Sequence, residues 1–277
     1  MVSKHQKTMT VVRTIMIGII AIAFSVPLIW MVLSSLKRPF EIFNIPFRWL
    51  PEVAQWKNFT DVWLNEEIPM FKSFLNSLLI AAGSLVGQLI IASFAAYAFA
   101  KIDFKGKNII FLLFLASMMI PTQVTIIPRF MLFKTIGLYN NLWAIILPSW
   151  FGASAIFMLR QFYMGLPNDL MEAAKIDGAS HLRIFLQIML PLTKAPLASL
   201  VILTFISSWN EYLAPLIFLI KPETMTVSQV IRWYVQEAGS DHFVLASAVI
   251  SLIPILIVFI TCQKYFVEGI ASSGVKG

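Results

Sequence analysis

Six long apolar stretches dominate this sequence, and each has the length that a lipid bilayer requires. A spanning α-helix needs about 20 apolar residues, because it rises about 1.5 Å per residue through about 30 Å of hydrocarbon. Six stretches meet this requirement, at roughly 14–36, 74–100, 109–127, 142–163, 197–220 and 243–265. The pattern predicts an all-α polytopic membrane protein whose residues 1–277 form a single domain of six transmembrane helices.

The balance of apolar and charged residues excludes most other classes of protein. Of the 277 residues, 58% are hydrophobic and 13% are charged, whereas a soluble chain has about 45–50% and about 25%. Too few polar side chains remain to cover soluble cores, so most soluble enzymes, secreted disulfide scaffolds and disordered proteins are excluded. The single cysteine, Cys262, excludes an intrachain disulfide and a multi-cysteine metal site.

The first apolar stretch has one feature of a secretory signal peptide. The residues Ala21-Ile22-Ala23 resemble a cleavage site. The apolar run continues past them to Leu36, however, and is longer than the 7–15 residues of a signal-peptide core. We therefore predict an uncleaved membrane span.

The excess of positive charge lies on one side of the predicted spans. The net charge is +7, but there is no dense Lys/Arg run to indicate nucleic-acid binding. The two termini, the 101–108 loop and the region around 165–196 carry twelve basic and five acidic residues, and the opposite set of segments carries nine of each. Cytoplasmic segments are enriched in Lys and Arg. Both termini are therefore predicted to be cytoplasmic, and the long segment 37–72 to be an outer loop.

The segment 165–196, between the fourth and fifth spans, is amphipathic and too polar to cross a membrane. Asn168 or Asp169 can cap a first helix, and Gly178 stands where a helix ends in a left-handed residue. Ser180 can cap a second helix that runs to Pro191. The spacing places apolar residues on one face of each helix: Leu170, Ala173 and Ala174 on the first, and Leu182, Phe185, Leu186 and Met189 on the second. Periodicity alone is equally consistent with a hairpin that lies on the bilayer surface.

A motif at fixed spacing distinguishes this segment from an ordinary interfacial hairpin. It consists of Glu172-Ala173-Ala174, Asp177-Gly178-Ala179, Ile188 and Leu190-Pro191. This pattern resembles the EAA motif of ABC importer permeases. Together with Ser208-Trp209-Asn210-Glu211-Tyr212 in the fifth span, it is similar to the carbohydrate-uptake permeases of the MalG type, which are binding-protein-dependent inner-membrane components.

The resemblance implies the type I ABC importer permease fold, with a cytoplasmic coupling helix between spans four and five. In that family the helix docks on an ATPase subunit. Glu172 would then be the charged contact, Ala173 and Ala174 the close-packing face, and Gly178 the turn.

The same resemblance implies a permease subunit of a bacterial ATP-driven importer for a sugar or oligosaccharide, located in the cytoplasmic membrane. It implies four kinds of partner besides the lipid bilayer: a second, MalF-like permease, two ATPase subunits, an external solute-binding protein and the saccharide. An importer of a phosphate ester, polyamine or amino acid stays open as an alternative. An ion-driven carrier needs several ionisable groups in its spans, and Glu211 is the one clear candidate here.

Motifs for catalysis are absent from the sequence. There is no G-x-x-x-x-G-K-[ST] pattern, so we expect ATP and Mg²⁺ to be bound by partner ATPase subunits and not by this chain. The histidines His5, His181 and His242 match no metal-ligand spacing. The prediction is a non-catalytic membrane subunit without a metal or cofactor of its own.

Polar and aromatic residues within the predicted spans are the candidates for a substrate path, because polar groups in a membrane usually face the bundle interior or a solvated cavity. They are Asn76, Gln88, Gln123, Trp209, Asn210, Glu211 and Tyr212. Hydrogen bonding between helices and aromatic belts at the interface are alternative explanations.

Three local features refine this picture of the spans. Helical spacing would place Ser207, Asn210 and Glu211 on one face of the fifth span. Pro215 cannot donate to the carbonyl of Glu211, and Pro121 likewise predicts a kink in the third span. The pattern Gly83-x-x-x-Gly87 predicts a face on which another helix packs closely.

Overall fold

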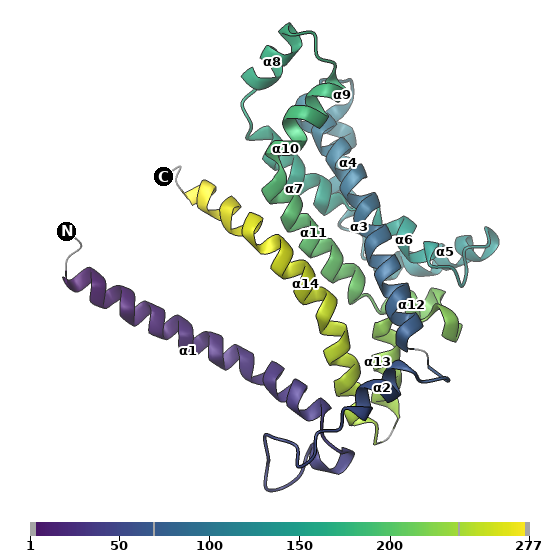
Figure 1. Ribbon diagram of the computed structural model, residues 1–277. Helices are drawn as coiled ribbons and strands as arrows, with labels where there is room; N and C mark the ends of the chain where they lie inside the picture. The colour runs from purple at the N-terminus through teal and green to yellow at the C-terminus, as the bar shows by residue number, and fades with distance from the viewer. Residues whose placement is uncertain (1–3, 69, 238, 275–277) are drawn as a thin grey trace. The chain divides into compact units, whose positions relative to one another are not determined.

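The computed structural model describes residues 4–68, 70–237 and 239–274, and within these ranges every regular element is helical (Figure 1). The chain divides into two compact units. One comprises Met1–Glu66 and Ile231–Ser251, and the other Glu67–Val230 and Leu252–Gly277. The assignment of all residues to one domain stays a prediction.

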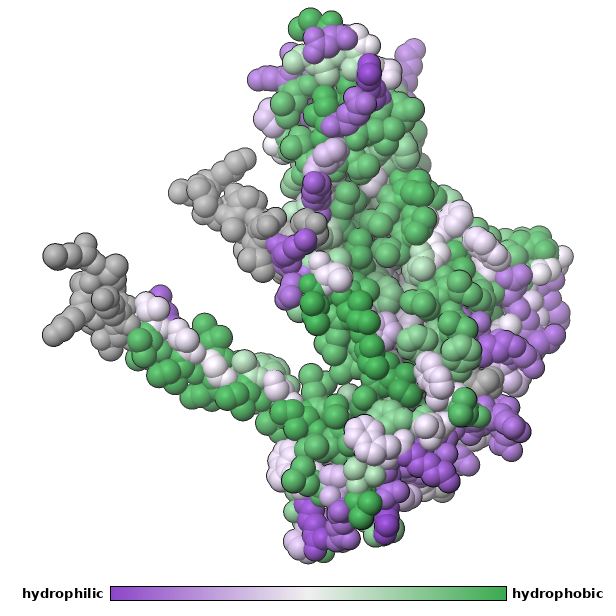
Figure 2. Space-filling model, viewed as in Figure 1, coloured by the Kyte–Doolittle hydropathy of each residue, from purple (hydrophilic) through white to green (hydrophobic). Residues whose placement is uncertain are grey.

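Among the described residues, four helical segments are long and apolar enough to cross a membrane. They lie within α1 (Lys4–Ser35), α3 (Met70–Lys101), the pair α6 (Trp143–Ser149) and α7 (Ala153–Met164), and α14 (Asp241–Gly274). Apolar side chains cover the outward surfaces of these helices (Figure 2). Two pairs of helices are apolar enough when taken together but are bent at a short break: Lys107–Ser117 with Thr122–Thr135, and His181–Leu192 with Lys194–Trp209. The total is six if each pair is one span. The predicted all-α polytopic architecture is confirmed.

The third predicted span, 109–127, is not one helix. α4 (Lys107–Ser117) ends before Pro121, and α5 (Thr122–Thr135) leaves at an angle of 95°. A proline lacks the N–H that would continue the helix, and it forces the preceding residue out of the helical region. The kink expected at Pro121 is therefore a complete break.

The fifth predicted span, 197–220, is also divided. α11 (Lys194–Trp209) and α12 (Leu213–Phe218) are separated by residues 210–212. The helical alignment predicted for Ser207, Asn210 and Glu211 is wrong, because the helix ends at Trp209. The carbonyl of Glu211, which Pro215 leaves without its helical donor, accepts a hydrogen bond from Ser228 Oγ at 2.7 Å.

In the first unit, the end of α1 is held by the segment that follows it. This segment contains the short helices η1 (Pro39–Glu41) and α2 (Lys57–Trp63). The amide Nδ2 of Asn58 donates to the carbonyls of Ser35 and Lys37, at 2.8 and 3.0 Å, and so satisfies groups at the helix end. Lys37 is buried, and its Nζ donates to the carbonyl of Arg48 at 2.6 Å. Burial lowers the pKa of Lys37, and the nearby Glu41 carboxylate partly offsets this effect.

In the second unit, α3 is the central helix and packs against α6, α7 and α11. Two glycines allow the close approach of α6. A Cβ at Gly83 would lie 3.1 Å from Cδ1 of Ile146, and a Cβ at Gly87 would overlap the indole ring of Trp150. Trp150 Nε1 donates to the carbonyl of Gly83 at 3.0 Å. The close-packing face predicted from the two glycines is confirmed.

In the second unit, the segment of chain between α7 and α11 forms four short helices. It contains α8 (Asp169–Ile176), α9 (His181–Ile184), the π-helix η2 (Phe185–Met189) and α10 (Leu190–Leu192). A second segment, with the short helix η3 (Pro222–Thr224) and the start of α13 (Val227–Gln236), follows α12. These two segments and the breaks in α4–α5 and α11–α12 position the features described next.

Candidate functional site

The predicted helix–turn–helix in 165–196 is present, and local chemistry forms its turn. α8 ends at Ile176, and Asp177 is its C-cap. The next residue, Gly178, has a φ of +77°, which is readily adopted only by a residue without a Cβ. The amide of Ala179 donates to the carbonyl of Ala174 at 2.9 Å and closes the turn. Ser180 then caps α9, and its side chain accepts from the amide of Arg183 at 3.4 Å. The turn thus follows from Gly178 and Ser180, as predicted.

The start of α8 differs from the prediction. Asn168 occupies the N-cap position, but its side chain makes no capping hydrogen bond. Instead Asn168 Oδ1 accepts from Lys101 Nζ at 2.7 Å, and the same ammonium group donates to the carbonyl of Leu166, also at 2.7 Å. Lys101 is the last residue of α3. Lys101, which the sequence places in the predicted 101–108 loop, therefore joins this segment to the central helix α3.

Pro191 does not end the second helix. The helical run continues through α10, and the chain turns at Thr193, where it bends by 77° into α11. The run therefore ends at Leu192, one residue beyond the predicted stop at Pro191. The preceding turn widens into the π-helix η2, which accommodates the backbone N–H donor that Pro191 lacks.

The buried face of α8 is formed by Met171 and Ala174, which pack into the core with Ile184, Phe185 and Met189. Leu170 and Ala173 are exposed, as are Leu182 and Leu186. Each predicted apolar face is therefore only partly buried: Ala174 of the first helix and Phe185 and Met189 of the second lie in the core, and the other members are exposed.

The motif residues consequently fall into two groups. Ala174 is buried, and Ala179 and Leu190 are partly buried. The exposed members of the motif are Glu172, Ala173, Asp177, Gly178 and Pro191. The neighbouring apolar residue Ile176, which is not part of the motif, is 87% exposed. Glu172 makes no side-chain hydrogen bond or ion pair with any residue that the structure describes. One face of α8 thus anchors the segment, and the other presents a carboxylate beside small and apolar groups.

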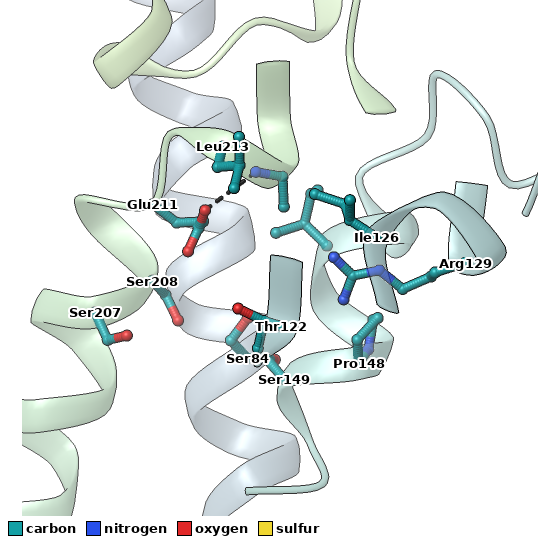
Figure 3. Close-up of a pocket in the computed structure, with 12 residues that line it drawn as sticks. Ser84, Thr122, Ile126, Arg129, Pro148, Ser149, Ser207, Ser208, Glu211 and Leu213 are labelled. Carbon is teal, nitrogen blue, oxygen red and sulfur yellow. Dashed lines mark hydrogen bonds between the residues drawn. The ribbon is translucent and has the colours of Figure 1, made fainter. Parts of the chain in front are cut away.

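A cavity of about 220 Å³ lies where three interrupted helices meet (Figure 3). Thr122 and Arg129 come from α5, Pro148 and Ser149 from the end of α6, and Glu211 from the break after α11. Its remaining lining residues are Ser84, Ile126, Ile145, Ser207, Ser208, Leu213 and Ala214. Interrupted backbone within a membrane is tolerated where it lines a cavity, and this arrangement meets that condition.

The cavity has one cationic and one anionic wall. The guanidinium Cζ of Arg129 lies 5.1 Å from the centre of the Phe218 ring, which holds it by a cation–π contact. Oε1 of Glu211 accepts from the amide of Ala214 at 3.1 Å. The two charged side chains extend toward the cavity from opposite sides (Figure 3). Sequence reading missed Arg129, although an arginine two residues beyond a predicted span was the signal that could have found it.

Three of the seven predicted path residues have structural partners elsewhere. Asn76 Nδ2 donates to the carbonyls of Glu223 and Met225, each at 2.9 Å. Oε1 of Gln88 accepts from Thr204 Oγ1 at 2.7 Å, which links α3 to α11. Trp209 is buried, and its ring stacks on that of Phe205 with centroids 5.6 Å apart.

The other four path residues lie near the two helix breaks. Glu211 lines the cavity. Gln123 and Asn210 are exposed and Tyr212 is partly exposed, and none of these three is among the cavity-lining residues. The structure therefore brings Glu211 together with Arg129 and a set of hydroxyl groups, and not with the other predicted residues.

Replacing Asn76 by alanine tests its structural position. The change removes both hydrogen bonds to the 221–226 segment and leaves two carbonyls without this donor, at an expected cost of about 1–3 kcal/mol. We expect a lower unfolding temperature in detergent and faster hydrogen exchange in residues 221–230. Gln123→Ala, at an exposed position, is the matched control and should change stability by less than about 0.5 kcal/mol. Unchanged stability together with loss of transport would instead place Asn76 in the substrate path.

Comparisons with known proteins give consistent results. The chain matches the family model described as "Binding-protein-dependent transport system inner membrane component" over residues 88–272. It is 34% identical over 280 residues to the arabinooligosaccharides transport system permease protein AraQ of Bacillus subtilis (strain 168), covering 99% of each chain. It is also 35% identical over 263 residues to the probable ABC transporter permease protein YurM of the same organism, covering 92% of this chain and 85% of that protein.

A third relative has a different named substrate. The sn-glycerol-3-phosphate transport system permease protein UgpE of Yersinia pestis bv. Antiqua (strain Antiqua) is 32% identical over 266 residues, with 94% of each chain covered. Among solved structures, this chain is similar to a chain in the crystal structure of a bacterial ABC transporter involved in the import of the acidic polysaccharide alginate. The TM-score is 0.79 at 24% identity, with 96% of this chain and 99% of that chain covered. At that identity the likeness shows the fold.

Proposed function

This chain belongs to the family of binding-protein-dependent transport system inner membrane components, and from that membership we propose that it is a permease subunit of an ATP-driven importer for a sugar or oligosaccharide. Its apolar helices make it a multi-pass protein of the bacterial inner membrane. The proposed subunit is itself non-catalytic. A second, MalF-like permease would complete the path, and an external binding protein would deliver the solute.

The observation that carries the proposal is the two-faced helix α8. Met171 and Ala174 fix it to this chain, while Glu172 and Ala173 remain exposed for another protein. A small residue permits close helix approach, and an exposed carboxylate can pair with a basic group. In the proposed complex α8 docks on one of two partner ATPase subunits, which bind ATP and Mg²⁺. This requires α8 and both termini to lie on the cytoplasmic side.

The internal contacts of the second unit provide a route by which movement of α8 can reach the cavity. Lys101 joins the start of the α8 segment to the end of α3. α3 carries Ser84 into the cavity and packs along α7 and α11. Displacement of α8 by the ATPase would therefore shift the helices around the cavity, which is what alternating access requires.

A sugar is the proposed cargo because AraQ, which aligns with almost the whole chain, is named for arabinooligosaccharides. The name of UgpE makes a phosphate ester the second candidate. The test is the assembled transporter in liposomes with its binding protein, supplied in turn with arabinotriose, maltotriose and sn-glycerol-3-phosphate. We expect ATP-dependent accumulation of a saccharide. Accumulation of sn-glycerol-3-phosphate alone would establish the alternative, and transport by this chain without ATP or partners would refute the class.

A further inference from the structure

Two buried polar atoms of residues that line the cavity have no hydrogen-bond partner among the residues that the structure describes. Ser84 is fully buried, and its Oγ has no hydrogen-bond partner among the described residues. Within the same set of residues, Nε of Arg129 is also buried and unpaired. Buried polar groups in proteins are nearly always satisfied, because an unpaired one loses its hydration without compensation. Both residues line the cavity, so its wall contains polar groups whose hydrogen-bonding capacity the described residues do not use.

The size of the cavity limits what can occupy it. A water molecule has about 30 Å³ in the liquid, so 220 Å³ is room for several waters or one small solute. Sites for drug-sized ligands are larger, at about 300–1,000 Å³. The cavity therefore accepts about one sugar ring of a saccharide at a time.

The chemistry of the lining favours an uncharged polyhydroxylated solute. A hydroxyl group both donates and accepts, so neighbouring hydroxyls can donate to Glu211 and accept from Arg129. Ser207 and Ser208 add further groups of the same kind, and Ile126, Pro148 and Leu213 offer an apolar wall for the C–H face of a ring. An anionic solute would pair with Arg129 but would place a second negative charge beside Glu211, which is unfavourable in a partly desolvated site.

We propose that this cavity binds one uncharged sugar ring, with Arg129 and Glu211 as its two charged contacts. The proposal rests on the proposed function as a saccharide importer and adds the site and the charge of the ligand. Arg129 donates to ring hydroxyls, and the carboxylate oxygen of Glu211 that is not held by Ala214 accepts from them. The opposite charges make the site neutral overall, and this neutrality provides the selection against acidic sugars.

The experiment measures binding to the purified complete transporter in nanodiscs without the binding protein, so that the site is observed directly. The probes are L-arabinose, D-glucose and D-glucuronate at concentrations on the order of 10 mM, detected by saturation-transfer NMR. D-Glucuronate differs from D-glucose by its carboxylate and so isolates the effect of charge. We expect a neutral sugar to bind and D-glucuronate to bind at least about tenfold more weakly than D-glucose.

Two variants test the charged contacts. Arg129→Gln should weaken binding of the neutral sugar by about tenfold or more, because a charge-assisted hydrogen bond is lost. Glu211→Gln should weaken it too, and should shift preference toward D-glucuronate by about tenfold, because the repelling carboxylate is gone. Lys134→Gln is the matched control, since Lys134 is exposed on α5 and does not line the cavity. Co-purification of the partner subunits checks assembly.

The outcomes separate this proposal from the proposed function. If both variants retain wild-type binding while the transporter still accumulates a saccharide with ATP, the cavity assignment is overturned and the importer stands. Binding of neither L-arabinose nor D-glucose also overturns it, as does preference of the wild type for D-glucuronate. If Arg129→Gln does not assemble, the change in selectivity of Glu211→Gln decides the matter alone.

Discussion

Replacing Glu172 by lysine is expected to abolish the stimulation of ATP hydrolysis by the loaded binding protein. In the proposed complex the exposed carboxylate pairs with a basic group on the ATPase, and lysine would replace that attraction by repulsion. Reversing one partner of an interfacial charge pair costs several kcal/mol, which corresponds to a loss of about 100-fold or more in productive docking. The measurement is ATPase activity of the reconstituted complex with and without loaded binding protein.

Asp169→Lys is the matched control for this experiment. Both acids lie in the first turn of α8 and are exposed, so each substitution loses the same favourable interaction with the helix dipole, about 0.3–1 kcal/mol. We expect Asp169→Lys to retain most of the stimulated activity and both variants to remain folded. Equal loss in the two variants would show that general charge on α8 matters and not the position of Glu172. Full activity of Glu172→Lys would remove the coupling assignment.

Gly87→Ala is expected to destabilise the subunit strongly, although alanine normally favours a helix. The new Cβ would overlap the indole ring of Trp150, so the ring must move and its hydrogen bond to the carbonyl of Gly83 is lost. Overpacking costs about 1–3 kcal/mol and the lost hydrogen bond about 1 kcal/mol, against a gain of about 1 kcal/mol from helix propensity. The net destabilisation of about 1–3 kcal/mol should be measured by denaturant unfolding in detergent.

Two further variants isolate the cause. Gly18 also lies within a helix, but a Cβ there would meet no atom within 4 Å, so Gly18→Ala should be neutral or slightly stabilising. In the double variant Gly87→Ala/Trp150→Ala the overlap no longer exists. The two substitutions should therefore be strongly non-additive. Additive effects, or wild-type stability of Gly87→Ala, would contradict the packing of α3 against α6 described above.

Local chemistry made several features predictable. The left-handed turn at Gly178 and the cap at Ser180 depend on residues within a few positions of one another, and they are found as expected. The apolar helices α1, α3 and α14 could be placed from length and hydropathy, because the thickness of the bilayer sets both. The packing role of Gly83 and Gly87 follows from the same kind of short-range spacing.

Other features depend on neighbours that are distant in sequence. A proline shows that a helix is perturbed, but the 95° angle between α4 and α5 depends on what the second segment packs against. Lys101 contacts Leu166 and Asn168, which lie more than 60 residues further along the chain. Asn76 was a candidate for the substrate path because it is polar, yet its partners are carbonyls near Met225.

The amino-acid sequence is sufficient to establish the class of this protein, through its membrane-spanning helices and a polar helix–turn–helix whose motif is typical of the family. Both are encoded by residues close together in the chain, where hydropathy and backbone preference act directly. Which polar groups share a site, in contrast, depends on how distant segments pack together. The meeting of Arg129 and Glu211 with Ser84 requires two interrupted segments, α4–α5 and α11–α12, to converge on the continuous helix α3. That convergence is a property of packing between segments, which no local pattern specifies.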